Sequence, residues 1–427
     1  MNNIIKISYH KYLKISLVLL CLFPAALISG PFLSNLLLIF ISFFFLLTYK
    51  SDKKFSFFKN YFLRFFGIFW AYILVSSLFS DSLFLSIKST LPYFRFGLFS
   101  LAVFLIFKNF SKSSKLFYIF LFCTLVVLIL DGYFQFITGF NIFGYRHARP
   151  DRLGGLFFDE LILGSFITKM TPLLITLSII NKKIFKEIYI CAFVFFAYFL
   201  VFLTGERASF FLFSLYLILI FPFFINLKKF LLLSLLFIAL LFLFILTNKN
   251  LKDRWIDQML MHTIHQDKEI KLFMPEHIGL FSSALDIFKK NMILGSGVKT
   301  FRVNCEYISE KKKNDLKKIN INTQFCSTHP HNYYLQLLAE TGLVGFLFII
   351  IIFCKLLFNY FLKLYFLIHK KDKLKTRTYV CILSALIVYL WPFTTSGNFF
   401  NNWLSSILYL TIGLFLFVQS NEARKNL

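Results

Sequence analysis

The sequence has few cysteines, and none of them stands in a CxxC pair. Seven Cys are spread over 427 residues in seven different settings, which excludes a disulfide scaffold and a zinc site of the usual spacing. HExxH-like histidine spacing is also absent, so the chain offers no metal site of the metalloprotease type. No internal repeat is evident either, which argues against repeat architectures.

Apolar residues dominate what is present. The chain is 58% hydrophobic and 20% aromatic, with 63 Phe, and its mean hydropathy is +0.73. No soluble domain of this length has such a composition, so we expect a polytopic membrane protein. The net charge of +26 would indicate nucleic acid binding in a soluble protein. Here the loop charges explain it better, and no nucleic acid partner is expected.

The apolar runs predict an all-α fold with about twelve transmembrane helices and one large extracytoplasmic loop carrying short amphipathic helices. The first run follows three lysines and resembles a signal peptide, but no small-residue cleavage site precedes the second run. We therefore expect an uncleaved hairpin of two spans. The predicted spans are 15–28, 32–48, 61–79, 92–107, 116–137, 161–180, 184–203, 208–226, 229–247, 343–366, 378–395 and 403–419.

The lysines of the short loops predict the orientation, because cytoplasmic loops carry the excess of positive charge. With both termini in the cytoplasm, the loops on that side contain clusters of lysine, whereas the short loops on the other side hold Lys88, Arg146, Arg149, Arg152 and Arg207. The large loop, about 248–332, then lies outside the cytoplasm. We divide the chain into 1–247 with nine spans, 248–342 with the periplasmic loop and a catalytic helix, and 343–427 with three spans.

The stretch CSTHPHNYYLQLLAETGLVG at 326–345 combines ionisable side chains with a membrane boundary. His329 and His331 flank Pro330, and a proline suits the first turn of a helix, so a helix is expected to begin near His331 and to stop at Gly342. One stripe of this helix carries Asn332, Gln336 and Glu340. The two histidines are poor metal ligands at this spacing. A general base is the better interpretation.

Two arginine-bearing segments lie on the predicted outer side. Arg207 stands in the short connection TGERAS, where it is either a snorkelling anchor or, beside Gly205, an anion ligand. The segment 145–165 joins three arginines to Gly154 and Gly155, which permit close approach to a ligand. A solvated loop with a turn explains this second segment equally well.

The large loop has further recognisable parts. Residues 277–290 form an amphipathic pattern that predicts a helix with Ile278, Leu280, Phe281, Leu285 and Phe288 available to pack. A turn through Gly295 and Gly297 follows. Cys305 and Cys326 would lie in an oxidising compartment, where they are either bridged or two free thiols.

These motifs together resemble the O-antigen ligase and O-antigen polymerase family. The resemblance is carried by TGERAS at a span boundary, by ALDIFKKNMILGSGVKTF in the large loop and by HPHNYYLQLLAETGLVGF before the next span. RLGGLFFDELILGSF before the sixth span is similar to a further element of the family. The resemblance covers residues 145–350.

The resemblance implies a transferase in the bacterial inner membrane that moves a glycan from undecaprenyl pyrophosphate to an acceptor hydroxyl on the periplasmic side. Lipid A-core is the acceptor in ligases, and another lipid-linked repeat unit is the acceptor in polymerases. No cofactor or metal is implied. His331 would be the base and Arg207 a pyrophosphate ligand. Beside these two, we expect His329 to be catalytic and Arg152 to bind the diphosphate, with Asn332, Glu160 and Glu340 in support.

One position departs from the family. Family members commonly carry an arginine at the start of the helix before the glycine turn, where this chain reads Glu276-His277-Ile278. His277 replaces it or Arg302 compensates, and both stay open.

Elementary chemistry agrees with this role. Pyrophosphate is a stable leaving group that needs charge neutralisation, which arginines supply, and an imidazole accepts the hydroxyl proton. A single displacement inverts the anomeric carbon. The competing interpretation is a transporter or flippase of lipid-linked sugars. Transporters more often have paired repeats and broken helices at the midplane, whereas this chain concentrates polar residues in one outer loop.

Overall fold

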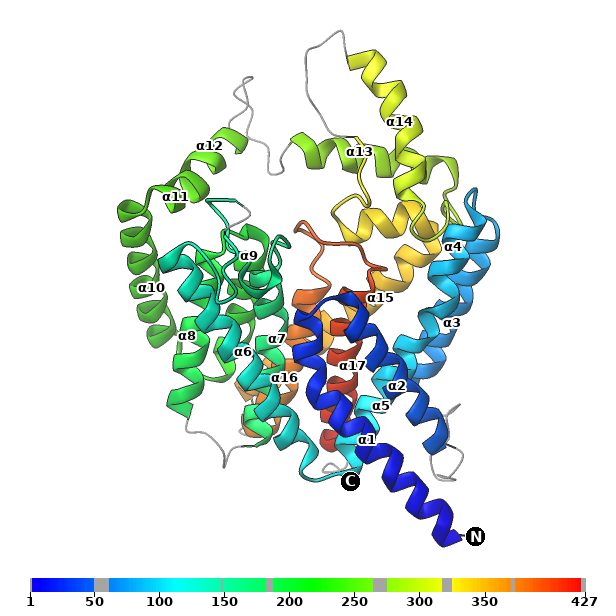
Figure 1. The fold of residues 1–427 in the computed structure, drawn as a ribbon, viewed down its shortest axis with the longest axis vertical. Helices are drawn as coiled ribbons and strands as arrows, with labels where there is room; N and C mark the ends of the chain where they lie inside the picture. The colour runs from blue at the N-terminus through cyan, green and yellow to red at the C-terminus, as the bar shows by residue number, and fades with distance from the viewer. Residues whose placement is uncertain are drawn as a thin grey trace.

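A computed structural model describes residues 2–49, 61–146, 149–181, 187–263, 275–316, 325–369 and 373–423. Within these ranges the chain is helical, with two isolated bridges, Phe140–Arg146 and Arg149–Arg152, and no strand (Figure 1). The predicted fold class, an all-α polytopic membrane protein, is confirmed.

The helices follow one another from the N-terminus as a series of long apolar elements. In the first half they are α1 Asn2–Ile28, α2 Pro31–Tyr49, α3 Tyr61–Leu78, α4 Leu83–Thr90, α5 Phe94–Asn109, α6 Ser113–Thr138, α7 Leu163–Ile180, α8 Glu187–Leu203 and α9 Arg207–Ile220. In the second half they are α10 Leu227–Thr247, α11 Lys249–Lys252, the π-helix η5 Asp253–Asp257, α12 Gln258–Thr263, α13 Pro275–Lys290, α14 Phe301–Leu316, α15 Tyr333–His369, α16 Lys373–Tyr389 and α17 Asn402–Ala423.

Nine helices of the described ranges are long and apolar enough to cross a membrane. Three shorter apolar helices, Glu187–Leu203, Arg207–Phe223 and Thr376–Tyr389, stand where further spans are predicted. α10 is the most apolar candidate, and only 6% of its residues are buried inside the protein. Such a surface is stable only against lipid tails or another apolar surface.

Figure 1 shows the N-terminal end of α1 and the C-terminal end of α17 at the same end of the molecule, opposite α13 and α14. That both termini lie in the cytoplasm and the large loop lies outside it remains a prediction. α10 ends at Thr247 and α15 bends at Gly342, and the division of the chain into three regions likewise stays a prediction.

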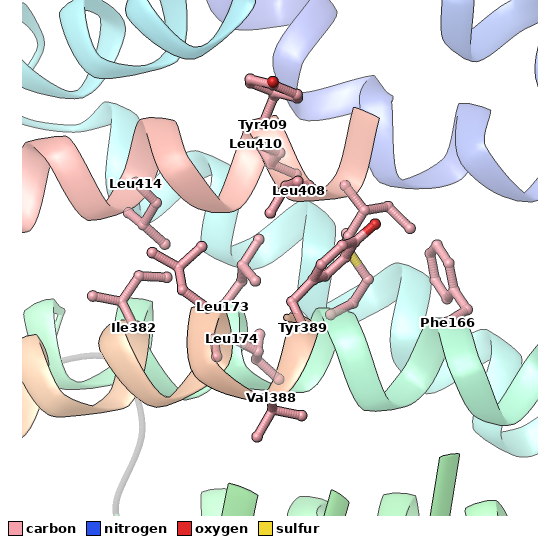
Figure 2. Close-up of a cluster of buried hydrophobic side chains, with 14 of the residues drawn as sticks. Phe166, Leu173, Leu174, Ile382, Val388, Tyr389, Leu408, Tyr409, Leu410 and Leu414 are labelled. Atoms are coloured by element: carbon pink, nitrogen blue, oxygen red, sulfur yellow. The ribbon is translucent and has the colours of Figure 1, made fainter. Parts of the chain in front are cut away.

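One part of the extended hydrophobic core lies between α7, α16 and α17 (Figure 2). Apolar side chains of the three helices interdigitate there, and the packing itself stabilises the contact because lipid is as apolar as the side chains. The buried residues include Phe166, Leu173, Leu174, Ile382, Val388, Tyr389, Leu408, Leu410 and Leu414.

Two backbones meet closely where α15 bends. Gly342 has φ +63°, and a Cβ there would lie 2.2 Å from the carbonyl oxygen of Ile293, so a glycine is required. The bend interrupts the backbone hydrogen bonds of α15, and the turn before α14 supplies other partners. Ser296 N donates to Ala339 O at 3.0 Å, and Leu343 N donates to Met292 O at 2.8 Å. The bend therefore fixes the turn that leads into α14.

α3 holds the same turn from the other side. Ser76 Oγ donates to Leu294 O and Ser80 Oγ to Ser296 O, both at 2.7 Å. These hydroxyls satisfy carbonyls that the turn leaves without helix partners. The predicted turn through Gly295 and Gly297 is confirmed, with φ of +73° and +103°.

Two details of the sequence prediction are wrong. α15 begins at Tyr333 rather than near His331, because His331 has φ +56°, which a right-handed helix excludes. α13 is confirmed as a helix, but Ile278 and Leu285 are exposed. Leu280 packs as predicted, and the buried face also carries Ser283, Ala284 and Ile287. Small side chains allow the close approach to α14 and α15.

Candidate active site

A cavity of about 1020 Å³ lies among α7, α9, α13, the start of α14, and the segments before α15 and α17. The turn between α1 and α2, the segment 152–162 and the end of α16 also contribute to its lining. The residues that carry polar or aromatic groups into the lining include Arg152, Glu160, Lys169, Glu206, His277, Lys299, Arg302, His329, His331, Tyr333, Tyr389, Trp391, Ser396, Asn398, Asn401, Asn402 and Trp403.

Three histidines meet in the lining of this cavity. The ring centroids of His329 and His331 are 4.2 Å apart, and those of His277 and His331 are 5.5 Å apart. His277 comes from α13, whereas the other two precede α15. Among the described residues no group of three His, Cys, Asp or Glu side chains has a metal-holding arrangement.

The histidine segment is held by the loop that connects α16 to α17. Ser396 N donates to His331 O at 2.8 Å, which fixes His331 in its left-handed conformation. The side chain of Asn332 contacts both α15 and this loop. Its Oδ1 caps the N-terminus of α15 by accepting from Tyr334 N at 3.0 Å, and its Nδ2 donates to Pro392 O at 2.8 Å. A strained, multiply anchored backbone is typical of functional positions.

The environment favours the neutral form of His329 and His331. Burial lowers the pKa of His331 below its ordinary value, and the neighbouring His277 lowers it further. Burial, followed by the proximity of His331, lowers the pKa of His329 to about 3. A neutral imidazole has a lone pair that accepts a proton. His331 thus has the protonation state that a general base needs at neutral pH.

Four cationic side chains share the lining, and we call Arg152, Lys169, Lys299 and Arg302 the charged lining. Lys299 stands in the turn before α14 with φ +63°, and burial, followed by Arg302, lowers its pKa. Arg302 Nε is buried and has no hydrogen-bond partner among the described residues. Partly desolvated cations with few internal partners attract anions strongly.

Lys169 is the member of the charged lining that lies in a predicted span. Its Nζ donates to Ser165 Oγ at 2.6 Å, one turn earlier in α7. It also lies 5.7 Å from the ring centroid of Tyr389. A lysine inside an apolar helix is costly unless it faces a polar cavity, and it marks functional sites in membrane proteins.

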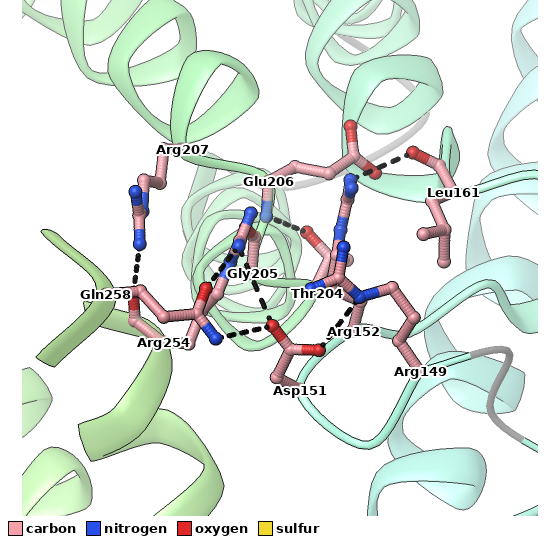
Figure 3. A network of polar contacts seen from close by, with 10 residues as sticks. All are labelled: Arg149, Asp151, Arg152, Leu161, Thr204, Gly205, Glu206, Arg207, Arg254 and Gln258. Atoms are coloured by element: carbon pink, nitrogen blue, oxygen red, sulfur yellow. Dashed lines mark hydrogen bonds and ion pairs between the residues drawn. The ribbon is translucent and has the colours of Figure 1, made fainter. Parts of the chain in front are cut away.

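Arg152 joins the cavity to a second group of arginines around Asp151 (Figure 3). Asp151 contacts Arg149 at 3.3 Å and Arg254 at 3.6 Å. Arg254 Nε also donates to Gly205 O at 2.9 Å. Burial and the nearby arginines lower the pKa of Arg254 to about 10. This group, Arg149, Asp151, Arg207 and Arg254, is the Asp151 cluster.

Arg207 belongs to the Asp151 cluster and does not line the cavity. Its guanidinium donates to Arg254 O. The adjacent Glu206 does reach the cavity and caps α7, accepting from Gly164 N at 2.7 Å and Ser165 N at 3.0 Å. Burial raises the pKa of Glu206, although the hydrogen bond from Ser209 and the charge of Arg152 oppose this.

The polar stripe predicted for the helix after the histidines is buried. Glu340 Oε1 accepts from Phe301 N at 3.2 Å, and Gln336 Nε2 donates to Glu340 Oε2 at 2.9 Å. The pair ties the start of α14 to α15, since Glu340 is fully buried. Its carboxylate lies behind the cavity and not in its lining.

A disulfide joins Cys305 and Cys326, whose Cα atoms are 5.0 Å apart. Cys305 lies one turn after Arg302 in α14, and Cys326 precedes the histidine segment. The bond therefore connects the part of the charged lining in α14 to the histidines.

A comparison with protein families favours one of the classes of membrane protein that this geometry permits. Residues 192–350 match the family model described as O-Antigen ligase. The resemblance found in the sequence is confirmed over this range, which we call the O-antigen ligase segment. No curated protein matches the chain. The match supports a membrane glycosyltransferase of the ligase or polymerase type.

The O-antigen ligase segment contains the three histidines, Lys299, Arg302 and Arg207. Arg152 and Lys169 precede it, and the segment 391–403 follows it. The fold thus completes the cavity with parts of the chain that lie outside the family match. The predicted Glu160 lines the cavity and is exposed.

Sequence reasoning missed Lys169, Lys299, Glu206 and Asn398. A lysine in an apolar run was a signal for Lys169, and Glu206 and Lys299 stand inside the quoted motifs TGERAS and GSGVKTF. Asn398 had no local signal, because only tertiary contacts bring it to the cavity.

Proposed function

We propose that this protein transfers a glycan from undecaprenyl pyrophosphate to a hydroxyl of lipid A-core on the periplasmic side of the bacterial inner membrane. One observation carries the proposal: three imidazoles and four cations line a single cavity. Such a lining suits a reaction that releases a diphosphate and consumes a hydroxyl proton.

In this proposal the charged lining neutralises the diphosphate of the donor. Arg152 and Arg302 offer forked donors for phosphate oxygens, and Lys299 offers a compact charge. His277 and Arg302 share the place of the missing family arginine, since both line the cavity. Arg207 lies in the Asp151 cluster beside Arg152, and its charge adds to the positive potential that Arg152 contributes to the cavity.

His331 acts as the base. The acceptor oxygen attacks the anomeric carbon, the bond from that carbon to the phosphate oxygen breaks, and its electron pair leaves with undecaprenyl pyrophosphate. The hydroxyl proton passes to the neutral ring of His331. This single displacement inverts the configuration. His329 positions the ring of His331, while Asn332 and Glu340 hold the backbone elements that carry the site.

The test uses purified protein in detergent with a lipid-linked glycan, an acceptor and no membrane gradient. We expect a new glycosidic bond and one undecaprenyl pyrophosphate for each product. A transporter of lipid-linked sugars would give no product, which would overturn the proposal.

The surface lipopolysaccharide of cells lacking the gene identifies the acceptor. We expect core-lipid without attached chains and long polymer on the carrier lipid. Core-lipid carrying one repeat unit without a ladder would replace lipid A-core by a second lipid-linked repeat as acceptor.

A further inference from the structure

Part of the cavity lining is uncharged and has no role in the proposed proton transfer or diphosphate binding. Its members are Tyr389, Trp391, Asn398 and Trp403, which we call the neutral lining. All lie at the end of α16, the start of α17 or between them. Aromatic faces with a few fixed polar groups are typical of small-molecule pockets.

Two of the aromatic rings are fixed by hydrogen bonds at their polar ends. The hydroxyl of Tyr389 donates to Leu404 O at 2.6 Å, and Trp403 Nε1 donates to Leu27 O at 2.8 Å. Because the polar ends are engaged, these side chains offer the cavity their apolar ring surface.

Asn398 is 8% exposed, and its orientation is determined without ambiguity. Phe400 N donates to Asn398 Oδ1 at 2.8 Å. A backbone N–H is only a donor, so the atom that it contacts is the oxygen. Gln336 Nε2 donates to the same oxygen at 3.0 Å.

The orientation of Gln336 is fixed in the same way. Phe399 N donates to Gln336 Oε1 at 2.8 Å, which leaves Nε2 as the donor toward Asn398 and Glu340. Gln336 is fully buried. The network therefore locks the amide oxygen of Asn398 toward the protein interior.

The amide nitrogen of Asn398 has two N–H groups and makes no hydrogen bond within the described residues. This nitrogen is not completely buried. Because Asn398 lines the cavity, these donors are available to a ligand bound there. A rigid donor that meets no acceptor in the protein is suited to an oxygen of a ligand.

We propose that Asn398 donates a hydrogen bond to an oxygen of a sugar ring, which lies against the aromatic faces of the neutral lining. The inference rests on the proposed function. A neutral amide among aromatic rings fits a sugar better than a phosphate, which the charged lining already serves. The sugar belongs either to the lipid-linked donor or to the acceptor.

The experiment measures kinetics and binding for Asn398→Asp and Asn398→Ser. The aspartate keeps an oxygen for Phe400 N and Gln336 and loses the N–H donors, whereas the serine is uncharged. Asn226→Asp is the matched control, because Asn226 Oδ1 caps α10 by accepting from Lys229 N at 3.0 Å and lies outside the cavity lining. An aspartate caps a helix equally well.

We expect both Asn398 variants to raise the KM of one substrate about tenfold, the effect of one hydrogen bond lost to a polar ligand group. A higher KM for the lipid-linked glycan shows that Asn398 contacts a sugar of that substrate, and a higher KM for the acceptor shows that it contacts a sugar of the acceptor. Asn226→Asp should match wild type.

Sugar-free undecaprenyl pyrophosphate separates a sugar contact from a phosphate contact. Its dissociation constant should be the same for wild type and Asn398→Ser. Weaker binding of this probe, or an unchanged KM for both substrates in folded Asn398→Ser, would overturn the assignment. Loss of product already in wild type would instead contradict the proposed transfer.

Discussion

The charged and the neutral lining share one cavity but are built in opposite ways. The cations of the charged lining come from three distant parts of the chain and have few partners, as Lys299 and Arg302 illustrate. The groups of the neutral lining come from one segment, and three of the four, Tyr389, Asn398 and Trp403, are held by hydrogen bonds. Cationic side chains attract an anionic leaving group over some distance and in many orientations. Recognition of a neutral sugar instead requires hydrogen-bond donors in fixed positions.

The largest effect is expected for His331→Ala, which removes the proposed base from the cavity lining. Turnover should fall by about 10²–10⁴, the usual contribution of general base catalysis. The assay measures glycosidic product from purified protein, and equal yield of folded protein is the control. His329→Ala should lose less, because His329 acts through His331. Equal losses in both variants would contradict the division of roles.

The second prediction removes cations from the charged lining. Arg302→Ala and Lys299→Ala should each weaken binding of undecaprenyl pyrophosphate about 10- to 100-fold, because a charge-assisted hydrogen bond contributes about 1.5–3 kcal/mol. Lys290→Ala is the matched control: Lys290 is exposed and lies 4.9 Å from the ring centroid of Tyr307. Unchanged affinity in the two lining variants would place the diphosphate elsewhere.

The third prediction concerns the Asp151 cluster. Arg207→Ala should raise the donor KM about tenfold, because it removes a charge beside Arg152. Arg149→Ala should change it less than about twofold, because an exposed ion pair contributes little. Steady-state kinetics at low and physiological salt distinguish the two. If both variants behave like wild type, the cluster is structural and the charged lining acts alone.

The fourth prediction follows from the proximity of His277 to His331. His331 must be neutral to accept a proton, so activity is present above its pKa and lost as pH falls through it. Burial and His277 lower this pKa below 6.5, so the acid limb of the pH–rate profile should lie below pH 6.5. His277→Gln should move the limb upward. An acid limb at the same pH in His277→Gln would show that His277 does not lower the pKa of His331.

The smallest effect on chemistry is expected for the disulfide. Replacing Cys305 and Cys326 by serine should lower the midpoint of thermal unfolding, because the bond closes a loop with a sequence separation of 21 residues. Turnover below the transition should fall only modestly. Wild-type protein treated with a reductant should behave like the variant, and an unchanged midpoint in both would show that the bond contributes no stability.

The sequence predicted the charged part of the site better than the neutral part. Arginines and histidines stand out in the outer loops of an apolar chain, so the sequence alone indicates Arg152, His277, Arg302 and the HPH pair as candidates, although it does not indicate Lys169 and Lys299. Asn398 was not, because its meaning depends on Gln336 and Glu340, which lie about sixty residues away. The spans were likewise predictable from apolar runs, whereas the left-handed His331 depends on a contact with Ser396.

The most direct test of the account is an experimental structure of the protein with undecaprenyl pyrophosphate bound in lipid or detergent. The account predicts the diphosphate inside the cavity, within hydrogen-bond distance of Arg152, Lys299 or Arg302. The ring of His331 should be separated from the terminal phosphate by the space that the transferred sugar and the acceptor hydroxyl occupy during the reaction. A diphosphate bound outside this cavity, away from the three histidines, would contradict it.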